Sequence, residues 1–98
     1  MLSKIPIEID RIDEEDLDKQ ILRLAIIAEL DAINLYEQLA NMTEDENIRT
    51  ILLDVAREEK THVGEFMALL LKLDEEQAEE FEAGKEEVEE LLEEEEEK

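Results

Sequence analysis

Three side chains that can bind a metal ion lie at positions where apolar residues would be expected. Glu29 lies within a helical pattern that has Ala25 behind it and Ala32 ahead of it, so its carboxylate should point inward. Glu59 and His62 form a Glu-x-x-His pair that continues the apolar face of a second helix. His62 is the only histidine in the chain. Carboxylate and imidazole groups together suit a divalent transition metal.

Carboxylates at such positions require a cation, because a buried, unpaired carboxylate costs several kcal/mol. Carboxylate-bridged di-iron bundles take a glutamate from each of two helices and a Glu-x-x-His pair from each of two others. This chain supplies one of each, so two copies would supply the full set for two Fe(II) ions. We therefore predict an iron site shared by a homodimer, with two Fe per dimer. Mn, Co or Zn could occupy the same donors.

Several of these signals also have simpler interpretations. A single Glu-x-x-His pair arises by chance on a glutamate-rich helix, where the histidine would be an ordinary core residue. Tyr36, seven residues after Glu29, fits either a hydrogen bond to a ligand carboxylate or an aromatic ring in the core. Asp31, Glu58 and Glu65 flank the ligand residues and are candidates for an acidic Fe(II) uptake path or for a solvated surface.

The elements that must position these residues are two long helices. Apolar residues recur at helical spacing over residues 13–42 and again over residues 44–73. Asp13 is a suitable N-cap for the first helix, and Thr43 with Glu46 forms a capping-box pattern before the second. Only a short polar break separates the helices, so we predict an antiparallel hairpin.

The ends of the chain show weaker patterns. The segment of residues 1–12 contains the only proline, Pro6, and the alternation Ile5, Ile7 and Ile9, which predict an extended arm, with a frayed end as the alternative. Asp74 is a suitable cap for a third helix over residues 75–92, with Gly84 as a predicted bend or interruption. Residues 93–98 predict an acidic tail or a frayed helix end. The predicted fold is therefore all-α, a two-helix hairpin with a short third helix that dimerises into a four-helix bundle.

The composition narrows the choice of partners. The chain of 98 residues reads as one domain over residues 1–98, with 32 acidic and 10 basic side chains and a net charge of -22. This charge repels nucleic acids and anionic lipid surfaces. The absence of cysteine excludes disulfides and thiolate metal sites. No apolar run has the length of a membrane span and no signal peptide pattern opens the chain, so we expect a cytoplasmic protein.

The sequence resembles that of encapsulated ferritins, short ferritin-like proteins found inside encapsulin nanocompartments. The resemblance extends from about Asp10 to Leu92 and rests on A-E-L-D-A-I-N-L-Y-E around Glu29 and R-E-E-K-T-H-V-G-E-F around Glu59 and His62. It implies a ferritin-like bundle in a ring of dimers, typically a decamer. It also implies a ferroxidase in which these three residues bind iron, Fe(II) and dioxygen are the substrates, and Fe(III) passes to an encapsulin shell for storage.

Two departures from the family pattern affect these expectations. Family members often have a further glutamate before the first ligand, where this chain has Ala28, which weakens the case for Asp31 in iron uptake. The chain finishes in Glu93 to Lys98 in place of a shell-targeting peptide, which suggests a shortened chain or a C-terminal fusion to the shell protein.

Two other functions remain open at this stage. A rubrerythrin-like di-iron peroxidase would need an electron donor that this cysteine-free chain cannot itself carry as an iron–thiolate centre. A non-catalytic acidic helical module would bind divalent cations or a protein partner on its surface, without turnover.

Overall fold

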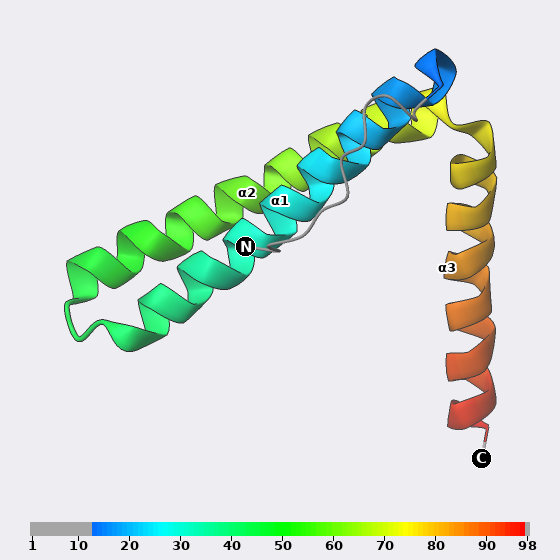
Figure 1. The fold of residues 1–98 in the computed structure, drawn as a ribbon. Coiled ribbons are helices and arrows are strands. Elements are labelled where there is room, and N and C mark those ends of the chain that lie inside the picture. Colours follow the sequence, from blue (N-terminus) through cyan, green and yellow to red (C-terminus); the bar gives the residue numbers. More distant parts are fainter. Residues whose placement is uncertain (1–12, 98) are drawn as a thin grey trace.

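The computed structural model describes residues 13–97, apart from the side chain of Glu15. The predicted arm over residues 1–12 lies outside this range. All regular structure within the described residues is helical, which confirms the predicted all-α class. Two helices form an antiparallel hairpin and the third projects away from its base (Figure 1). The helices are α1 (Glu14–Met42), α2 (Glu46–Leu73) and α3 (Glu75–Glu96).

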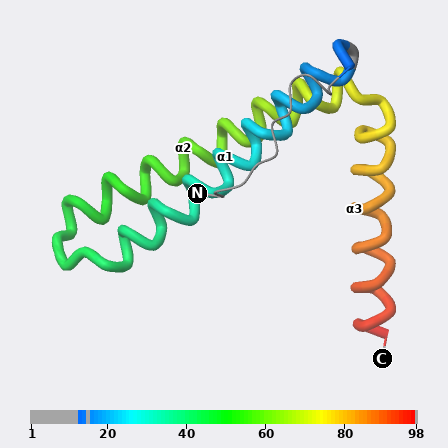
Figure 2. The backbone as a smooth tube through the Cα atoms, viewed as in Figure 1, coloured from blue at the N-terminus to red at the C-terminus, as the bar shows by residue number. Residues whose placement is uncertain are grey.

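The helices α1 and α2 lie side by side along the hairpin (Figure 2), and a narrow seam of buried apolar side chains joins them. The buried residues of α1 are Ile26, Ile33 and Ala40, which are seven residues apart. Those of α2 are Ala56 and Leu70, which are two heptads apart. Heptad spacing keeps one face of each helix on its neighbour, as in a coiled coil. The small alanine side chains allow the two backbones to approach closely.

The apolar faces of the helices are wider than this seam. Each helix of a hairpin covers only one side of the other, so several positions in the predicted apolar stripes remain exposed. The same holds on α3, where every large apolar side chain is exposed. The exposed stripe residues include Ile21, Leu35, Leu39, Ile48, Ile51, Leu69 and Leu73 of the hairpin and Phe81, Val88, Leu91 and Leu92 of α3.

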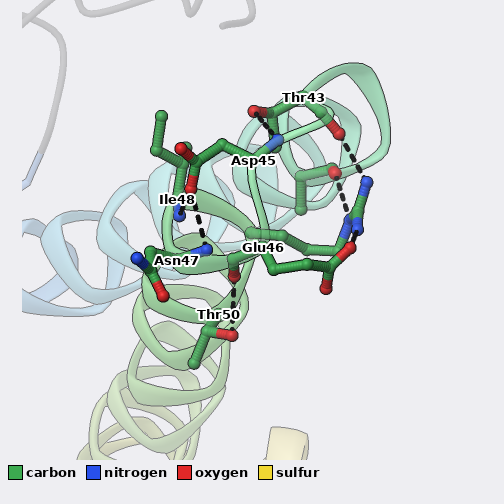
Figure 3. Close-up of polar contacts among 8 residues, drawn as sticks. Thr43, Asp45, Glu46, Asn47, Ile48 and Thr50 are labelled. Atoms are coloured by element: carbon green, nitrogen blue, oxygen red, sulfur yellow. Dashed lines mark hydrogen bonds and ion pairs between the residues drawn. The ribbon is translucent and has the colours of Figure 1, made fainter.

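The hairpin turn is organised by Asp45 and not by the predicted capping box (Figure 3). The Asp45 carboxylate accepts hydrogen bonds from the backbone N–H groups of Asn47 at 2.8 Å and Ile48 at 3.1 Å. The Thr43 hydroxyl accepts a hydrogen bond from the Asp45 N–H at 3.2 Å. The prediction that Thr43 caps a helix beginning at residue 44 was therefore wrong. Asp45 directly precedes Glu46, the first helical residue, and its carboxylate can reach the free amides of the first turn.

Arg49 also ties this turn to the end of α1 through hydrogen bonds of its guanidinium group. Its Nε donates a hydrogen bond to the Ala40 carbonyl at 3.0 Å, and its Nη2 donates to the Thr43 carbonyl. Its Nη1 also pairs with Glu46. The last turn of α1 has no basic residue of its own, so Arg49 of α2 supplies the cation that a helix C-terminus favours.

Asp74 is the single residue between α2 and α3. Its carboxylate accepts a hydrogen bond from the Gln77 N–H at 3.0 Å, which confirms it as the predicted cap. The predictions of a bend or interruption at Gly84 and of a helix that stops at residue 92 were wrong, because α3 continues through Gly84 to Glu96. Of the two interpretations of the acidic end, the helical one agrees with the structure. Gly84 has no positive φ, and the cost of about 1 kcal/mol for a helical glycine is tolerable among strong helix formers such as glutamate.

Candidate metal centre

The hairpin turn sets the height of the ligand residues along the two helices. Glu29 lies 13 residues before Met42, the last residue of α1, and Glu59 lies 13 residues after Glu46, the first residue of α2. At a rise of about 1.5 Å per residue, both lie roughly 20 Å from the turn. His62 follows Glu59 by three residues, nearly one helical turn, and therefore shares its face.

The three side chains meet between α1 and α2. His62 Nδ1 is 3.1 Å from Glu29 Oε2 and 3.5 Å from Glu59 Oε2. One ligand atom from each residue can be chosen so that all three lie within 4.8 Å of one another. Residues 33 positions apart in the chain are thus brought within reach of a single ion. Two carboxylates and an imidazole match the mixed oxygen and nitrogen donors that suit Fe(II) and related metals.

This cluster is open on one side. The side chains of Glu29 and Glu59 are 22% and 18% exposed, whereas that of His62 is 45% exposed. His62 is thus more exposed in the single hairpin than in the core position predicted for it in a four-helix bundle, since α1 and α2 form only one layer. Three protein donors on one side of an ion leave coordination positions free on the other.

The other residues singled out in the sequence lie on the same two helices but outside the cluster. Tyr36 and Asp31 are half-buried on α1, and Glu58 and Glu65 are exposed on α2. Among the described residues, the three acidic side chains of this group lie outside the set of possible ligands. Their role in iron uptake remains a prediction.

Glu58 belongs to a separate charged group on the outer face of α2. Arg57 hydrogen-bonds to Asp54, and this contact, with a smaller contribution from Glu58, lowers the pKa of the Asp54 carboxyl. The same contact raises the pKa of Arg57. The Asp54 carboxylate is already paired with Arg57, so it attracts a metal ion less strongly than an unpaired carboxylate would.

Two ion pairs that cross between elements could not be recognised in the sequence. Lys60, next to Glu59, reaches Glu37 of α1 at 3.4 Å. Arg23 of α1 reaches Asp74 at 2.9 Å. Their partners lie 23 and 51 residues away, so local spacing could not reveal them. The sequence does show that basic residues are few in an acidic chain. Each basic residue is therefore a candidate for an ion pair with a carboxylate.

A helical hairpin that brings together a glutamate from one helix and a Glu-x-x-His pair from the next has the arrangement of one half of a ferritin-like bundle. Residues 5–84 match the model of the EncFtn-like family, and the chain belongs to this family. Within the described residues, no helix combines the length and the apolar character needed to cross a bilayer.

Relatives and a solved structure agree with this assignment. A ferritin-like–encapsulin shell fusion protein of Pyrococcus furiosus is 76% identical over 72 residues, which are 74% of this chain and 21% of that protein. An encapsulin nanocompartment cargo protein of Myxococcus xanthus is 47% identical over 57 residues, or 58% of this chain and 44% of that protein. This chain thus spans about a fifth of the length of the fusion protein it matches.

The crystal structure of an encapsulated ferritin domain from Pyrococcus furiosus superimposes with a TM-score of 0.79 at 64% identity. The alignment covers 93% of this chain and 95% of the crystallised one. The resemblance to encapsulated ferritins seen in the sequence is therefore confirmed.

Proposed function

We propose that this chain is one half of a ferroxidase, which oxidises Fe(II) to Fe(III) with dioxygen at a two-iron centre completed by a second copy. The observation that carries the proposal is the convergence of Glu29, Glu59 and His62 within 4.8 Å of one another. Two copies contribute four carboxylates and two imidazoles. The four negative charges of the carboxylates balance the charge of two Fe(II) ions. The metal supplies the redox chemistry, and the protein residues bind and orient it.

The hairpin holds these donors close together before iron binds. Glu29 comes from α1 and the Glu59 and His62 pair comes from α2, so a shift of one helix against the other would separate them. The contact between His62 Nδ1 and Glu29 Oε2 keeps imidazole and carboxylate within hydrogen-bond range. Iron binding would exchange this contact for metal–ligand bonds and would require little rearrangement, which favours affinity.

The open side of the centre supports completion by a second copy. His62 is 45% exposed, and several apolar side chains of the hairpin are also exposed. Exposed apolar surface of this kind is typical of a site that another protein surface covers. A second hairpin would supply the same donors to the other side of the two ions and would bury apolar stripe residues in a four-helix bundle. A ring of such dimers, by family resemblance a decamer, is part of this proposal.

The two relatives support a location inside an encapsulin compartment. One is named as a fusion with an encapsulin shell and the other as cargo of an encapsulin nanocompartment. We extend this to the present chain, which would deliver Fe(III) for storage within a cytoplasmic encapsulin shell. Fusion at the C-terminus is the form of attachment that we propose.

Anaerobic Fe(II) titration followed by exposure to air tests the catalytic proposal. Binding should saturate at one iron per chain, with rapid growth of ferric absorbance, and Glu59→Ala should lose both. Glu80→Ala removes an equally charged but exposed side chain on α3 and should behave as the parent.

The result that contradicts the proposal is equally specific. Fe(II) oxidation by Glu59→Ala at the parent's rate would exclude the shared centre. Weak binding of many ions, displaced by salt in the parent and in both variants, would leave the acidic surface-binding module as the better interpretation.

A further inference from the structure

The third helix has little packing against the rest of the molecule. Among the described residues α3 contacts α2 near their junction and makes no close backbone approach to α1. It extends away from the base of the hairpin (Figure 1). Its large apolar side chains are exposed along its length. Packing of apolar surface therefore does little to set its direction.

An open cavity lies at the corner where the first turn of α3 meets the hairpin. Its volume is 320 Å³, and its apolar lining comes from both hairpin helices. Two polar side chains, one from α1 and one from α3, complete the wall. The lining residues are Arg23, Ile26, Ile27, Met67, Leu70 and Gln77. Because this corner is not filled by side chains of α3, a change in the direction of α3 would meet little steric resistance there.

Asp74 connects all three helices at this corner. Its Oδ2 accepts a hydrogen bond from Arg23 Nη2 of α1 at 2.9 Å. Its Oδ1 accepts from the Gln77 N–H of α3 at 3.0 Å, and its own N–H donates to the Leu70 carbonyl of α2 at 2.9 Å. Its side chain is only 11% exposed. A single carboxylate thus holds the base of α1 and the start of α3 at the same time.

We propose that Asp74 is a lock that fixes the direction of α3 relative to the hairpin, with its own backbone as the hinge. Loss of the Asp74–Arg23 ion pair frees α3 to swing about this one-residue link and changes the width of the corner cavity. The lowered pKa of Asp74, caused chiefly by the Gln77 amide and also by Lys19 and Arg23, agrees with a carboxylate held in its charged form. The lock is independent of iron chemistry, so it stands or falls separately from the proposed ferroxidase.

A distance measurement between the hairpin and α3 tests the lock. The chain has no cysteine, so Gln38→Cys on α1 and Glu90→Cys on α3, both at exposed positions, accept two spin labels without competing sites. Pulsed electron paramagnetic resonance then gives the distribution of the distance between the labels. Doubly labelled chains are diluted into unlabelled chains so that only distances within one chain are measured.

Three variants separate the lock from ordinary helix capping. Asp74→Asn keeps a side-chain oxygen for the Gln77 amide but removes the charge that holds Arg23, and Arg23→Gln breaks the same pair from α1. Asp45→Asn makes the identical change at the cap of α2. The first two variants should widen the distance distribution to at least about twice that of the parent, as expected for a released hinge. Asp45→Asn should leave it narrow.

Two results would overturn the proposal. One is a distribution as narrow as the parent's in Asp74→Asn and Arg23→Gln, with circular dichroism showing that the helices are intact. The other is equal widening in Asp45→Asn, which would mean that capping in general, and not the ion pair, controls α3. If Asp74→Asn fails to fold, Arg23→Gln decides alone, because the Arg23 side chain is 47% exposed and its replacement disturbs no core packing.

Discussion

At each end of α2 the next helix in the chain begins with an aspartate cap, but the chain takes a different direction at the two ends. At one end Asp45 caps α2 after a three-residue link, residues 43–45, and the chain reverses into a packed hairpin. At the other end Asp74 caps α3 after a one-residue link, and the chain turns aside. The difference lies in the length of the link and in the basic partner. Arg49 reaches back to the carbonyls of Ala40 in α1 and Thr43 in the link and closes the turn, whereas Arg23 holds the Asp74 carboxylate.

The consequence is a division between a packed region and an extended one. The hairpin has an interhelical seam and brings the three candidate metal-binding side chains together. By contrast, 13 of the 22 residues of α3 are glutamate and none is buried. Changes in the hairpin should therefore alter metal binding or the stability of the packed fold, whereas changes in α3 should alter mainly the helicity of α3 itself. The predictions below test this division.

The largest effect is expected from His62→Ala. Removal of a direct ligand should lower Fe(II) affinity by more than the ~10–100-fold typical of residues that only support ligands. The His62 side chain is 45% exposed, so helical content should change little. Anaerobic titration measures the affinity, with Glu89→Ala on α3 as the control. Unchanged affinity in His62→Ala would remove the histidine from the centre.

A large effect on stability is expected from Ala40→Leu. Ala40 is 1% exposed in the hairpin seam, so a larger side chain should destabilise the fold by about 1–3 kcal/mol. Ala83 is half-buried on α3, and Ala83→Leu should change stability by less than about 0.5 kcal/mol. Urea unfolding at one fixed protein concentration compares the two variants. Equal destabilisation would show that α3 is as well packed as the hairpin.

A smaller, favourable effect is expected from Gly84→Ala. An added Cβ would have no neighbour within 4 Å, and Gly84 has no positive φ, so the change should stabilise α3 by about 0.5–1 kcal/mol. Gly64→Ala in α2 also has free space within the single hairpin. Thermal unfolding followed by circular dichroism measures both. A gain at Gly84 together with a loss at Gly64 would indicate that a second copy packs on α2 at that position.

The smallest effect is the pH dependence of Asp74. Because its pKa in the folded chain is lowered from the ordinary value of 3.8, its contribution to stability is present above that value. The contribution is lost as the pH falls through the lower folded pKa. The difference in Tm between the parent and Asp74→Asn should thus be largest near neutral pH and should shrink in acid. A difference that stays constant down to the acid limit would contradict this.

Sequence patterns predicted the helices and the ligand cluster because both depend on local spacing. The Glu-x-x-His pair and the glutamate of the preceding helix were identified from helical periodicity, and the structure brings all three together. The turn was less predictable, because Thr43 and Asp45 are both good caps and lie two residues apart. Gly84 was read as a break because propensity alone does not show that its strongly helical neighbours carry the helix through.

The direction of α3 and the exposure of the apolar faces could not be predicted at all. The first depends on an ion pair between residues 51 positions apart, and the second depends on how many layers cover the helices. Neither leaves a periodic trace in the sequence. The open side of His62 is the clearest example, since its position in the apolar pattern suggested a buried core residue.

The equal distance of Glu29 and Glu59 from the turn limits how this hairpin can change in length during evolution. One residue inserted into α2 between Glu46 and Glu59 would rotate Glu59 and His62 by about 100° relative to the turn and carry them away from Glu29. Seven residues inserted into both helices would restore the facing arrangement to within roughly 20° per helix. Insertions and deletions between the turn and the metal centre should therefore survive only as matched pairs of whole heptads.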